Sequence, residues 1–154
     1  GYSASLMYFA SGTQPHITTI ERYDKMVGLA KENFAKAGIS DHINLIEGDA
    51  VEVLDELEGS FDLIFLDAAK GQYPHFLKNC IRLLRPEGVL LCDNVLYKGM
   101  TAEKKLVIRR KITIVKRLRK FIDEIMHCDA LDTSLMPLGD GVTISRKRST
   151  EEQS

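Results

Sequence analysis

The 154-residue sequence lacks the features that hold disulfide-rich, fibrous or membrane-spanning proteins together. Its three cysteines, Cys80, Cys92 and Cys128, are odd in number and lack C-x-x-C spacing, so we expect buried thiols in a reducing cytoplasm rather than disulfides. Prolines number only 4 and glycines 11. No apolar run approaches the roughly 18 residues of a membrane span. This length and composition are typical of one soluble globular domain.

Sequence signatures of two large enzyme classes are also missing. The four histidines show no metal-ligand spacing, and neither a G-x-S-x-G elbow nor a P-loop occurs, which argues against a hydrolase triad and a nucleotide kinase. The sequence starts at Gly1 without a methionine or a signal-like segment, so we expect further residues upstream.

Charge is balanced overall but segregated along the chain. The 21 Lys+Arg and 22 Asp+Glu exclude a histone-like basic protein and an acidic disordered tail. Nine acids and no Lys or Arg lie from Asp41 to Ala69, whereas nine basic residues and no acid lie from Lys104 to Lys120. The first stretch is suited to cations and the second to anions.

Short apolar segments alternate with amphipathic helical patterns, which indicates repeated β-α units and a mostly parallel sheet. Gly139-Asp140-Gly141 is typical of the turn of a closing antiparallel hairpin. We expect a single domain at residues 1–148 and a polar tail at 149–154. Strands are expected at 17–20, 43–46, 61–66 and 88–92, helices at 24–37, 73–84 and 102–127, a turn at 85–88, and hairpin strands at 131–138 and 142–145.

An acidic residue follows each expected parallel strand, and the carboxyl ends of such strands share the edge where open α/β folds bind ligands. Glu21 also lies about 20 residues after Gly1-Tyr2-Ser3, the spacing at which nucleotide-binding folds place an acid on the ribose. The alternative for Glu21 is a strand-end carboxylate facing water. The strand-end acids, expected to converge on one edge, are Glu21, Glu47 with Asp49, Asp67, and Asp93.

Asp67, Asp93 and Asn94 form an all-oxygen set at two of these strand ends. Such a set suits Mg²⁺ better than zinc. The alternative is that Asp67 caps the next helix and Asp93-Asn94 opens a turn. Lys70, three residues after Asp67, is placed to act as a base beside such a metal, unless it is an ordinary surface lysine.

The basic stretch has two interpretations. On a helix it is either a solvated face or a phosphate-binding patch, and it lacks the interleaved aromatic residues that stack on bases. Seven of its nine basic residues would form this face, Arg109, Arg110, Lys111, Lys116, Arg117, Arg119 and Lys120, joined later by residues 146–148.

Six segments in order resemble those of the cation-dependent class I O-methyltransferases, the family that includes catechol and caffeoyl-CoA O-methyltransferases. The resemblance covers nearly the whole chain and implies a Rossmann-like α/β fold with helices on both faces of the sheet. The segments are Gly1-Tyr2-Ser3-Ala4, Thr18-Thr19-Ile20-Glu21, Glu47-Gly48-Asp49-Ala50, Phe61-Asp62-Leu63-Ile64-Phe65-Leu66-Asp67, Asp93-Asn94-Val95-Leu96 and Pro137-Leu138-Gly139-Asp140-Gly141.

The resemblance implies S-adenosylmethionine bound along the strand ends, with Ser3 near its methionine part and Glu21 on its ribose. It places Gly48, Asp49 and Ala50 in the cofactor site, the last two beside the adenine. It makes Asp67, Asp93 and Asn94 the Mg²⁺ ligands, brings Asp67 close to the cofactor as well, and makes Lys70 the general base.

For the methyl acceptor, the chain most resembles the bacterial branch that methylates 5-hydroxyuridine in tRNA, whose phosphates would meet Arg109, Arg110, Lys116, Arg117 and Lys120. The first alternative is a small catechol or a caffeoyl-CoA-type acceptor, which needs no basic face. The second, from another class, is a non-catalytic nucleotide- or RNA-binding domain. The family precedent is a homodimer.

Overall fold

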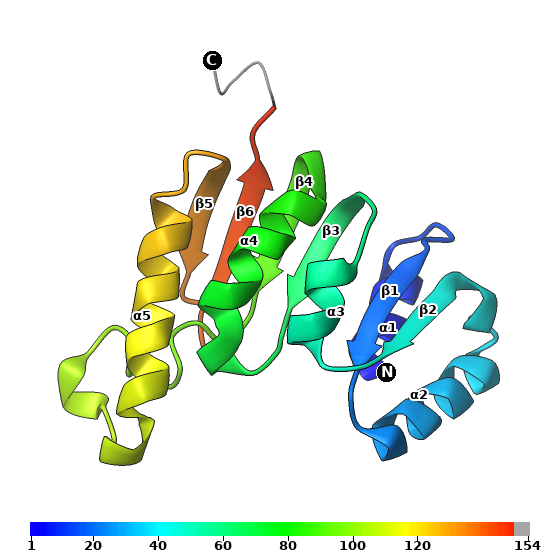
Figure 1. Cartoon of the computed structure of the whole chain (residues 1–154), viewed down its shortest axis with the longest axis horizontal. Helices are drawn as coiled ribbons and strands as arrows, with labels where there is room; N and C mark the ends of the chain where they lie inside the picture. Colours follow the sequence, from blue (N-terminus) through cyan, green and yellow to red (C-terminus); the bar gives the residue numbers. More distant parts are fainter. Residues whose placement is uncertain (150–154) are drawn as a thin grey trace. The chain divides into compact units, whose positions relative to one another are not determined.

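The computed structural model describes residues 1–149, which form two compact units, Gly1–Leu57 and a second that starts at Glu58. Each unit has its own sheet (Figure 1). No helix within residues 1–149 is long and apolar enough to cross a membrane. From Thr150 onward, the expected polar tail lies outside the described residues.

The first unit is built on two parallel strands. β1 (Ile17–Glu21) and β2 (Ile43–Glu47) pair in register from Ile17 opposite Ile43 to Glu21 opposite Glu47, so both expected strands are confirmed. A small core of Ala4, Ala30, Phe34 and Ile39 packs the helices together. The remaining elements are α1 (Tyr2–Ala10), α2 (Asp24–Ala37), a 3-10 turn η1 (Ser40–His42) and α3 (Ala50–Glu56).

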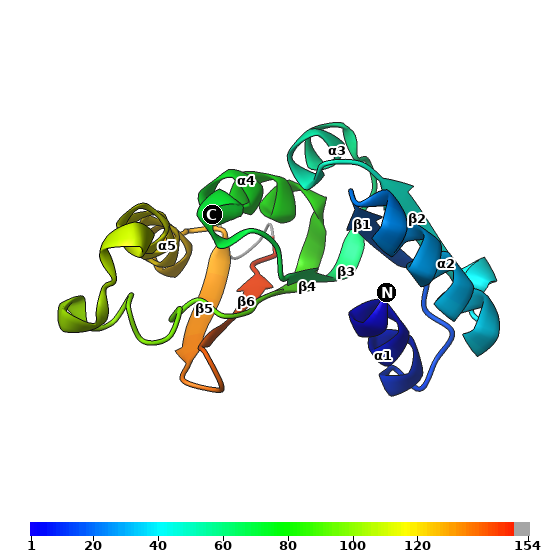
Figure 2. The same ribbon diagram turned by 90° about the horizontal axis from the view of Figure 1, so that it is seen from below.

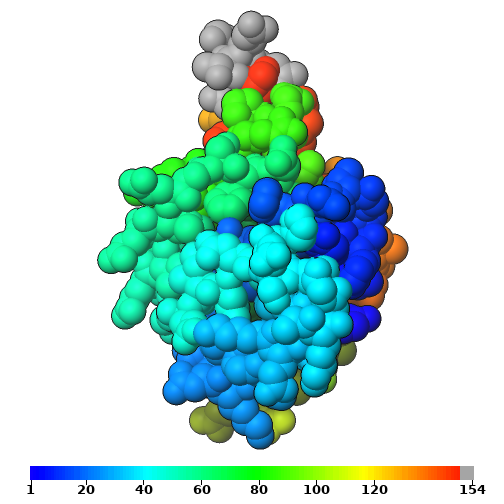
Figure 3. All heavy atoms as spheres, turned by 90° about the vertical axis from the view of Figure 1, so that its right-hand side faces the viewer, coloured from blue at the N-terminus to red at the C-terminus, as the bar shows by residue number. Residues whose placement is uncertain are grey.

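α2 forms where the helical pattern predicts it. Val27, Ala30 and Phe34 are buried at helical spacing, and the opposite side of the helix lies on the surface of this unit, in the blue part of Figure 3. Gly38 ends the helix in the left-handed region (φ 68°), a backbone conformation that glycine adopts without a steric penalty. Ala37, the last residue of the helix, is exposed.

The second unit contains a four-stranded sheet in the order β3-β4-β6-β5. β3 (Phe61–Leu66) and β4 (Leu84–Cys92) are parallel, whereas β6 (Val142–Lys147) is antiparallel to both β4 and β5 (Leu131–Met136). The closing hairpin expected from the Gly139-Asp140-Gly141 turn is therefore confirmed.

Two helices cover one face of this sheet, α4 (Tyr73–Leu83) and α5 (Ile112–Met126) (Figure 2). The rings of Tyr73 and Phe121 meet edge to face at 5.2 Å between centroids. Leu90 and Cys92 of β4 are fully buried. The core of the unit thus lies directly beneath the carboxyl end of β4.

The long helix expected at 102–127 is wrong in its first part. α5 begins at Ile112, and two 3-10 turns precede it, η3 (Lys104–Leu106) and η4 (Arg109–Lys111). Between them Val107 and Ile108 are extended, and Ile108, although it stands at helical spacing from the apolar Ile112 and Val115, is 51 % exposed. β-branched side chains disfavour helix, and these clustered cations have no acid four residues away to offset their repulsion.

The turn expected at 85–88 is also wrong. β4 already begins at Leu84, opposite Phe61, and the register shifts between Phe61 and Leu63. Glu87 has a positive φ of 64°, so the Arg-Pro-Glu-Gly segment forms an irregularity inside the strand instead of a separate turn.

Candidate functional site

The ends of β3 and β4 bring the expected metal and base residues together in the second unit. Leu66 is opposite Cys92 in the parallel register, and the Asp93 amide donates to the Leu66 carbonyl (3.1 Å). Asp67 directly follows β3 and Asp93 directly follows β4, so the two residues lie at neighbouring positions on one edge of the sheet. The expected convergence of strand-end acids holds for this pair.

Lys70 lies between these two strand ends. Its Nζ donates to Asp67 Oδ1 (2.7 Å), to the Tyr73 hydroxyl (2.8 Å) and to the Asp93 carbonyl (3.2 Å). The Lys70 side chain is only 15 % exposed. It is therefore not an ordinary surface lysine, and its amine is held at the position where the two acids meet.

Tyr73 is a member of this site that the sequence analysis missed. The residue is 0 % exposed, and its hydroxyl lies 3.0 Å from the Leu66 carbonyl and 2.9 Å from the Asp93 carbonyl. Burial raises the pKa of its hydroxyl far above the ordinary value, so the phenol stays protonated. The signal in the sequence was a tyrosine at a buried helix position three residues after Lys70, because a buried hydroxyl needs a partner.

The oxygen atoms at this edge fit a hard divalent cation. Asp93 Oδ1 accepts from the Asn94 amide (2.6 Å) and from Asn94 Nδ2 (3.1 Å), and Asp93 Oδ2 takes part in neither of these bonds. Among residues 1–149, no three histidine, cysteine or carboxylate side chains gather into a metal-binding cluster. Two carboxylates and an amide suit Mg²⁺, which keeps several of its own waters.

The turn between β5 and β6 is hydrogen-bonded to the chain that follows Asn94. Val95 N donates to the Gly141 carbonyl (3.0 Å) and Leu96 N to the Asp140 carbonyl (2.8 Å), while Asp140 Oδ1 accepts from the Lys98 amide. Asn94 has a positive φ of 55° and Lys98 one of 58°. The hairpin therefore stabilises a segment whose backbone is strained. Such strain is common next to functional sites.

The thiols near this edge are not nucleophiles. Burial raises the pKa of both Cys80 and Cys92 to about 12, so both stay protonated at neutral pH. All three cysteines are free thiols in this structure, with Cys80 and Cys92 buried and Cys128 half-buried.

In the first unit, Glu21 ends β1 opposite Glu47, and the Gly48 amide donates to the Glu21 carbonyl (3.1 Å). Glu21 Oε1 accepts from the amides of Arg22 (2.9 Å) and Tyr23 (3.0 Å). The carboxylate is half-buried and held by the backbone. These two bonds to Oε1 fix the orientation of the carboxylate.

Asp49 is the N-cap of α3, and its Oδ1 accepts from the Val51 amide (2.9 Å). Its Oδ2 pairs with Arg22 at 3.0 Å. The pKa of this carboxyl lies below its usual range. The hydrogen bond from the Val51 amide contributes most to this lowering, and the hydrogen bond from Arg22 contributes next. Ala50 begins α3, and Ser3 is exposed in the first turn of α1. These expected cofactor residues belong to the first unit, whereas Asp67, Lys70, Asp93 and Asn94 belong to the second.

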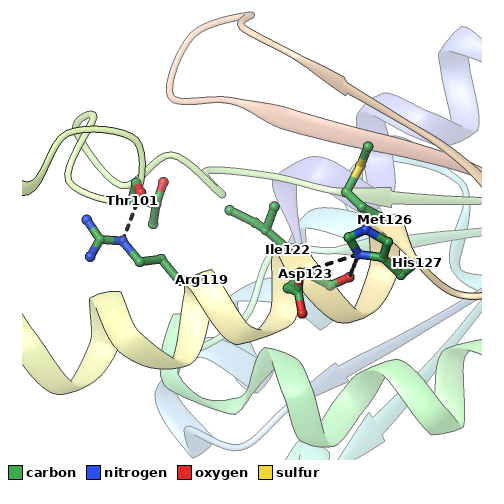
Figure 4. Close-up of a pocket in the computed structure, with 6 residues that line it drawn as sticks. All are labelled: Thr101, Arg119, Ile122, Asp123, Met126 and His127. Carbon is green, nitrogen blue, oxygen red and sulfur yellow. Dashed lines mark hydrogen bonds and ion pairs between the residues drawn. The ribbon is translucent and has the colours of Figure 1, made fainter.

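The basic stretch does not form one continuous helix face. Arg119 turns inward, donating to the carbonyls of Thr101 and Met100, both at 2.9 Å, and lines a shallow pocket of about 460 Å³ along α5 (Figure 4). The pocket contains none of the residues expected to bind cofactor or metal, and two of its lining residues, Asp123 and His127, pair with each other. The exposed members are Arg109, Arg110, Lys116, Arg117 and Lys120.

Comparison with known proteins links the chain to one family. The sequence profile of the O-methyltransferase family matches residues 1–148. A caffeoyl-CoA O-methyltransferase 1 of Eucalyptus globulus is 36% identical over 121 residues, which cover 73% of this chain and 48% of that protein. A caffeoyl-CoA O-methyltransferase of Citrus natsudaidai is 33% identical over 138 residues, covering 83% and 58%. The chain thus spans about half the length of these curated relatives.

A solved structure agrees with this comparison. The SAH-bound methyltransferase of Podospora anserina superposes with a TM-score of 0.85 at 36% identity, over 97% of this chain and 68% of that one. The expected α/β class is confirmed, and the fold is that of its methyltransferase neighbours.

Proposed function

The chain belongs to the O-methyltransferase family, and from this premise we propose that it transfers a methyl group from S-adenosylmethionine to a hydroxyl of a small acceptor with two neighbouring oxygens. The observation that carries the proposal is the set of Asp67, Lys70 and Asp93 gathered at the ends of β3 and β4. The acceptor is of the catechol or caffeoyl-CoA type.

The residues of the first unit supply the cofactor contacts in this proposal. Glu21, whose Oε1 is held by two backbone amides, offers its other oxygen to the ribose hydroxyls. The turn of Gly48, Asp49 and Ala50 follows β2 and accommodates the adenine, while Ser3 at the start of α1 contacts the methionine part.

Asp67, Asp93 and Asn94 would hold a Mg²⁺ ion in the second unit. When bound, such a cation makes an acceptor hydroxyl more acidic and fixes its oxygen for displacement. Lys70 Nζ, held at the same edge, would take the proton that leaves the hydroxyl as a neutral amine, becoming an ammonium in that step. The oxygen lone pair then forms the new O–CH₃ bond as the C–S bond breaks, and S-adenosylhomocysteine leaves with both electrons of that bond.

For the acceptor, the names of the curated relatives support a small phenolic compound better than the tRNA 5-hydroxyuridine first expected. One observation still favours tRNA as a second candidate, namely the exposure of Arg109, Arg110, Lys116, Arg117 and Lys120. Exposed cations on a helix are usually only solvated, so they carry less weight than the relatives.

The test is transfer of labelled methyl groups by the full-length protein to catechol, caffeoyl-CoA and hypomodified tRNA, with Mg²⁺ or with EDTA. We expect Mg²⁺-dependent transfer to a small acceptor. Transfer only to tRNA would replace the acceptor class, and no transfer to any of the three by correctly folded protein would contradict the proposal in favour of a non-catalytic binding domain.

Replacing Asp93 tests the proposed metal. Asp93→Ala should lower kcat about a hundredfold or more, because several kcal/mol of transition-state stabilisation depend on the bound cation. Asp62→Ala is a matched control, since Asp62 lies on the neighbouring strand β3, is exposed and pairs with Arg85. Equal activity of Asp93→Ala and wild type would remove Asp93 from the site.

A further inference from the structure

Tyr73 links three parts of the strand-end site through a single buried hydroxyl. That hydroxyl is 2.8 Å from Lys70 Nζ, 3.0 Å from the Leu66 carbonyl and 2.9 Å from the Asp93 carbonyl. It accepts from the lysine and donates its one proton to one of the two carbonyls. The amine is thereby connected to the last residue of β3 and to the residue that follows β4.

The fold fixes the Tyr73 ring independently of Lys70. Tyr73 is the first residue of α4, and Pro74 follows it at a position where a helix loses no hydrogen bond to proline. The ring packs edge to face on Phe121 of α5 and is 0 % exposed. The hydroxyl is therefore a fixed point, set by the packing of two helices.

The other partners of Lys70 constrain it less. Asp67 is 48 % exposed at its side chain, so its ion pair with Lys70 is screened by water. The hydrogen bond to the Asp93 carbonyl is longer, at 3.2 Å. A lysine side chain has four rotatable bonds, and a screened carboxylate alone leaves many positions open to its amine.

We propose that Tyr73 is the positioning residue that holds the Lys70 amine between Asp67 and the ends of β3 and β4. This assignment rests on the proposed function, because it matters to turnover only if Lys70 takes the acceptor proton. Tyr73 itself touches neither acceptor nor cofactor in this role and acts through Lys70.

The first test measures the accessibility of the Lys70 amine without any acceptor. The full-length protein is acetylated with limiting acetic anhydride, and the rate at each lysine is read by peptide mass spectrometry. In the wild type, Lys70 should react at least about tenfold more slowly than the exposed Lys36. Equal rates would overturn the proposal, even if no variant of Tyr73 folds.

In Tyr73→Phe, acetylation of Lys70 should rise several-fold, while that of Lys147 should not change. Lys147 Nζ is held by the carbonyls of Ile81 and Leu84, both at 2.7 Å, and so reports any general loosening of the unit. Thr133→Val is a matched control, because it removes a hydroxyl that bonds the Ile125 carbonyl (3.1 Å) and the Ser145 hydroxyl (2.8 Å) in the same unit. An equal rise at Lys70 and Lys147 would show a merely structural role and overturn the proposal.

The second test is a double-mutant cycle on methyl transfer to an accepted acceptor, with catechol tried first. We expect Tyr73→Phe to lower kcat about tenfold with the KM for S-adenosylmethionine within about twofold, and Lys70→Ala to lower kcat about a hundredfold. The double variant should resemble Lys70→Ala, because Tyr73 acts through that amine. Additive losses, near a thousandfold, would contradict the coupling.

The two proposals fail differently in these tests. If Lys70→Ala retains full activity, the proposed function loses its base whatever Tyr73 does. If Lys70→Ala is inactive but Tyr73→Phe keeps wild-type kcat and wild-type Lys70 acetylation, only the role of Tyr73 is refuted.

Discussion

At the scale of single residues, Asp49 shows how one carboxylate serves both a helix and a charge pair. It caps α3 through the Val51 amide and pairs with Arg22, and both contacts keep its pKa low. The same residue is proposed to lie beside the adenine. A side chain with a structural role of this kind limits which substitutions can test the cofactor site alone.

The lowered pKa of Asp49 predicts a dependence of stability on pH. A carboxyl whose folded pKa lies below its unfolded value, about 3.9, adds stability above that value and loses it as the pH falls through the folded pKa. The difference in free energy of unfolding between wild type and Asp49→Ala should therefore be full near pH 7 and shrink in strong acid. Urea titrations at several pH values measure it.

A control separates the charge of Asp49 from its capping role. Asp49→Asn keeps an oxygen that can accept from the Val51 amide but carries no charge. We expect this variant to lie between wild type and Asp49→Ala at pH 7. A wild-type to alanine difference that is constant from pH 7 to strong acid would contradict the assignment.

At the scale of elements, the β5–β6 hairpin determines the shape of the segment that carries two expected metal ligands. Its turn accepts hydrogen bonds from the amides of Val95, Leu96 and Lys98, just after Asn94. A hairpin distant in the sequence thus supports the strand-end site from the side.

Gly141→Ala should disturb this support. Gly141 has φ 82°, and an added Cβ would overlap the side chain of Leu96. We expect a loss of about 1–2 kcal/mol from the left-handed backbone and about 1–3 kcal/mol more from crowding, with reduced methyl transfer. Thermal unfolding and kcat measure the two effects.

Gly139→Ala is the matched control in the same turn. Gly139 has φ 55°, but its added Cβ would meet nothing within 4 Å. This variant should show the backbone cost alone and keep its activity. Equal losses of stability and activity in Gly141→Ala and Gly139→Ala would mean that the Leu96 side chain moves aside without displacing the strand-end site.

At the scale of the whole molecule, the sequence predicted most elements and missed what depends on packing between them. The strand ends at Glu21 and Asp67 could be predicted because an apolar run followed directly by an acidic residue is visible in the local sequence. The start of α5 was missed because helical spacing at Ile108 says nothing about whether another element covers it. Tyr73 was missed as a site residue because its role depends on three partners, two of them carbonyls that leave no trace in a sequence.

The basic residues of the second unit allow a test of the acceptor class. If the acceptor is a neutral phenol such as catechol, replacing Arg109, Arg110, Lys116 and Lys120 by glutamine should leave kcat/KM for that phenol within about twofold at all salt concentrations, because a neutral acceptor releases no counterions. Methyl-transfer assays from low to moderate salt measure this. A steep, salt-dependent loss of activity on tRNA would favour the second candidate.

The strand order β3-β4-β6-β5 has a consequence for the order in which the protein is made. β6 is the last strand in the described sequence, yet it lies between β4 and β5 and positions the turn that holds Val95 and Leu96. During synthesis, Asp67, Lys70 and Asp93 leave the ribosome well before their brace does. In the nascent chain we therefore expect the segment after Asn94 to lack its hydrogen bonds to the β5–β6 turn until translation has passed Lys147.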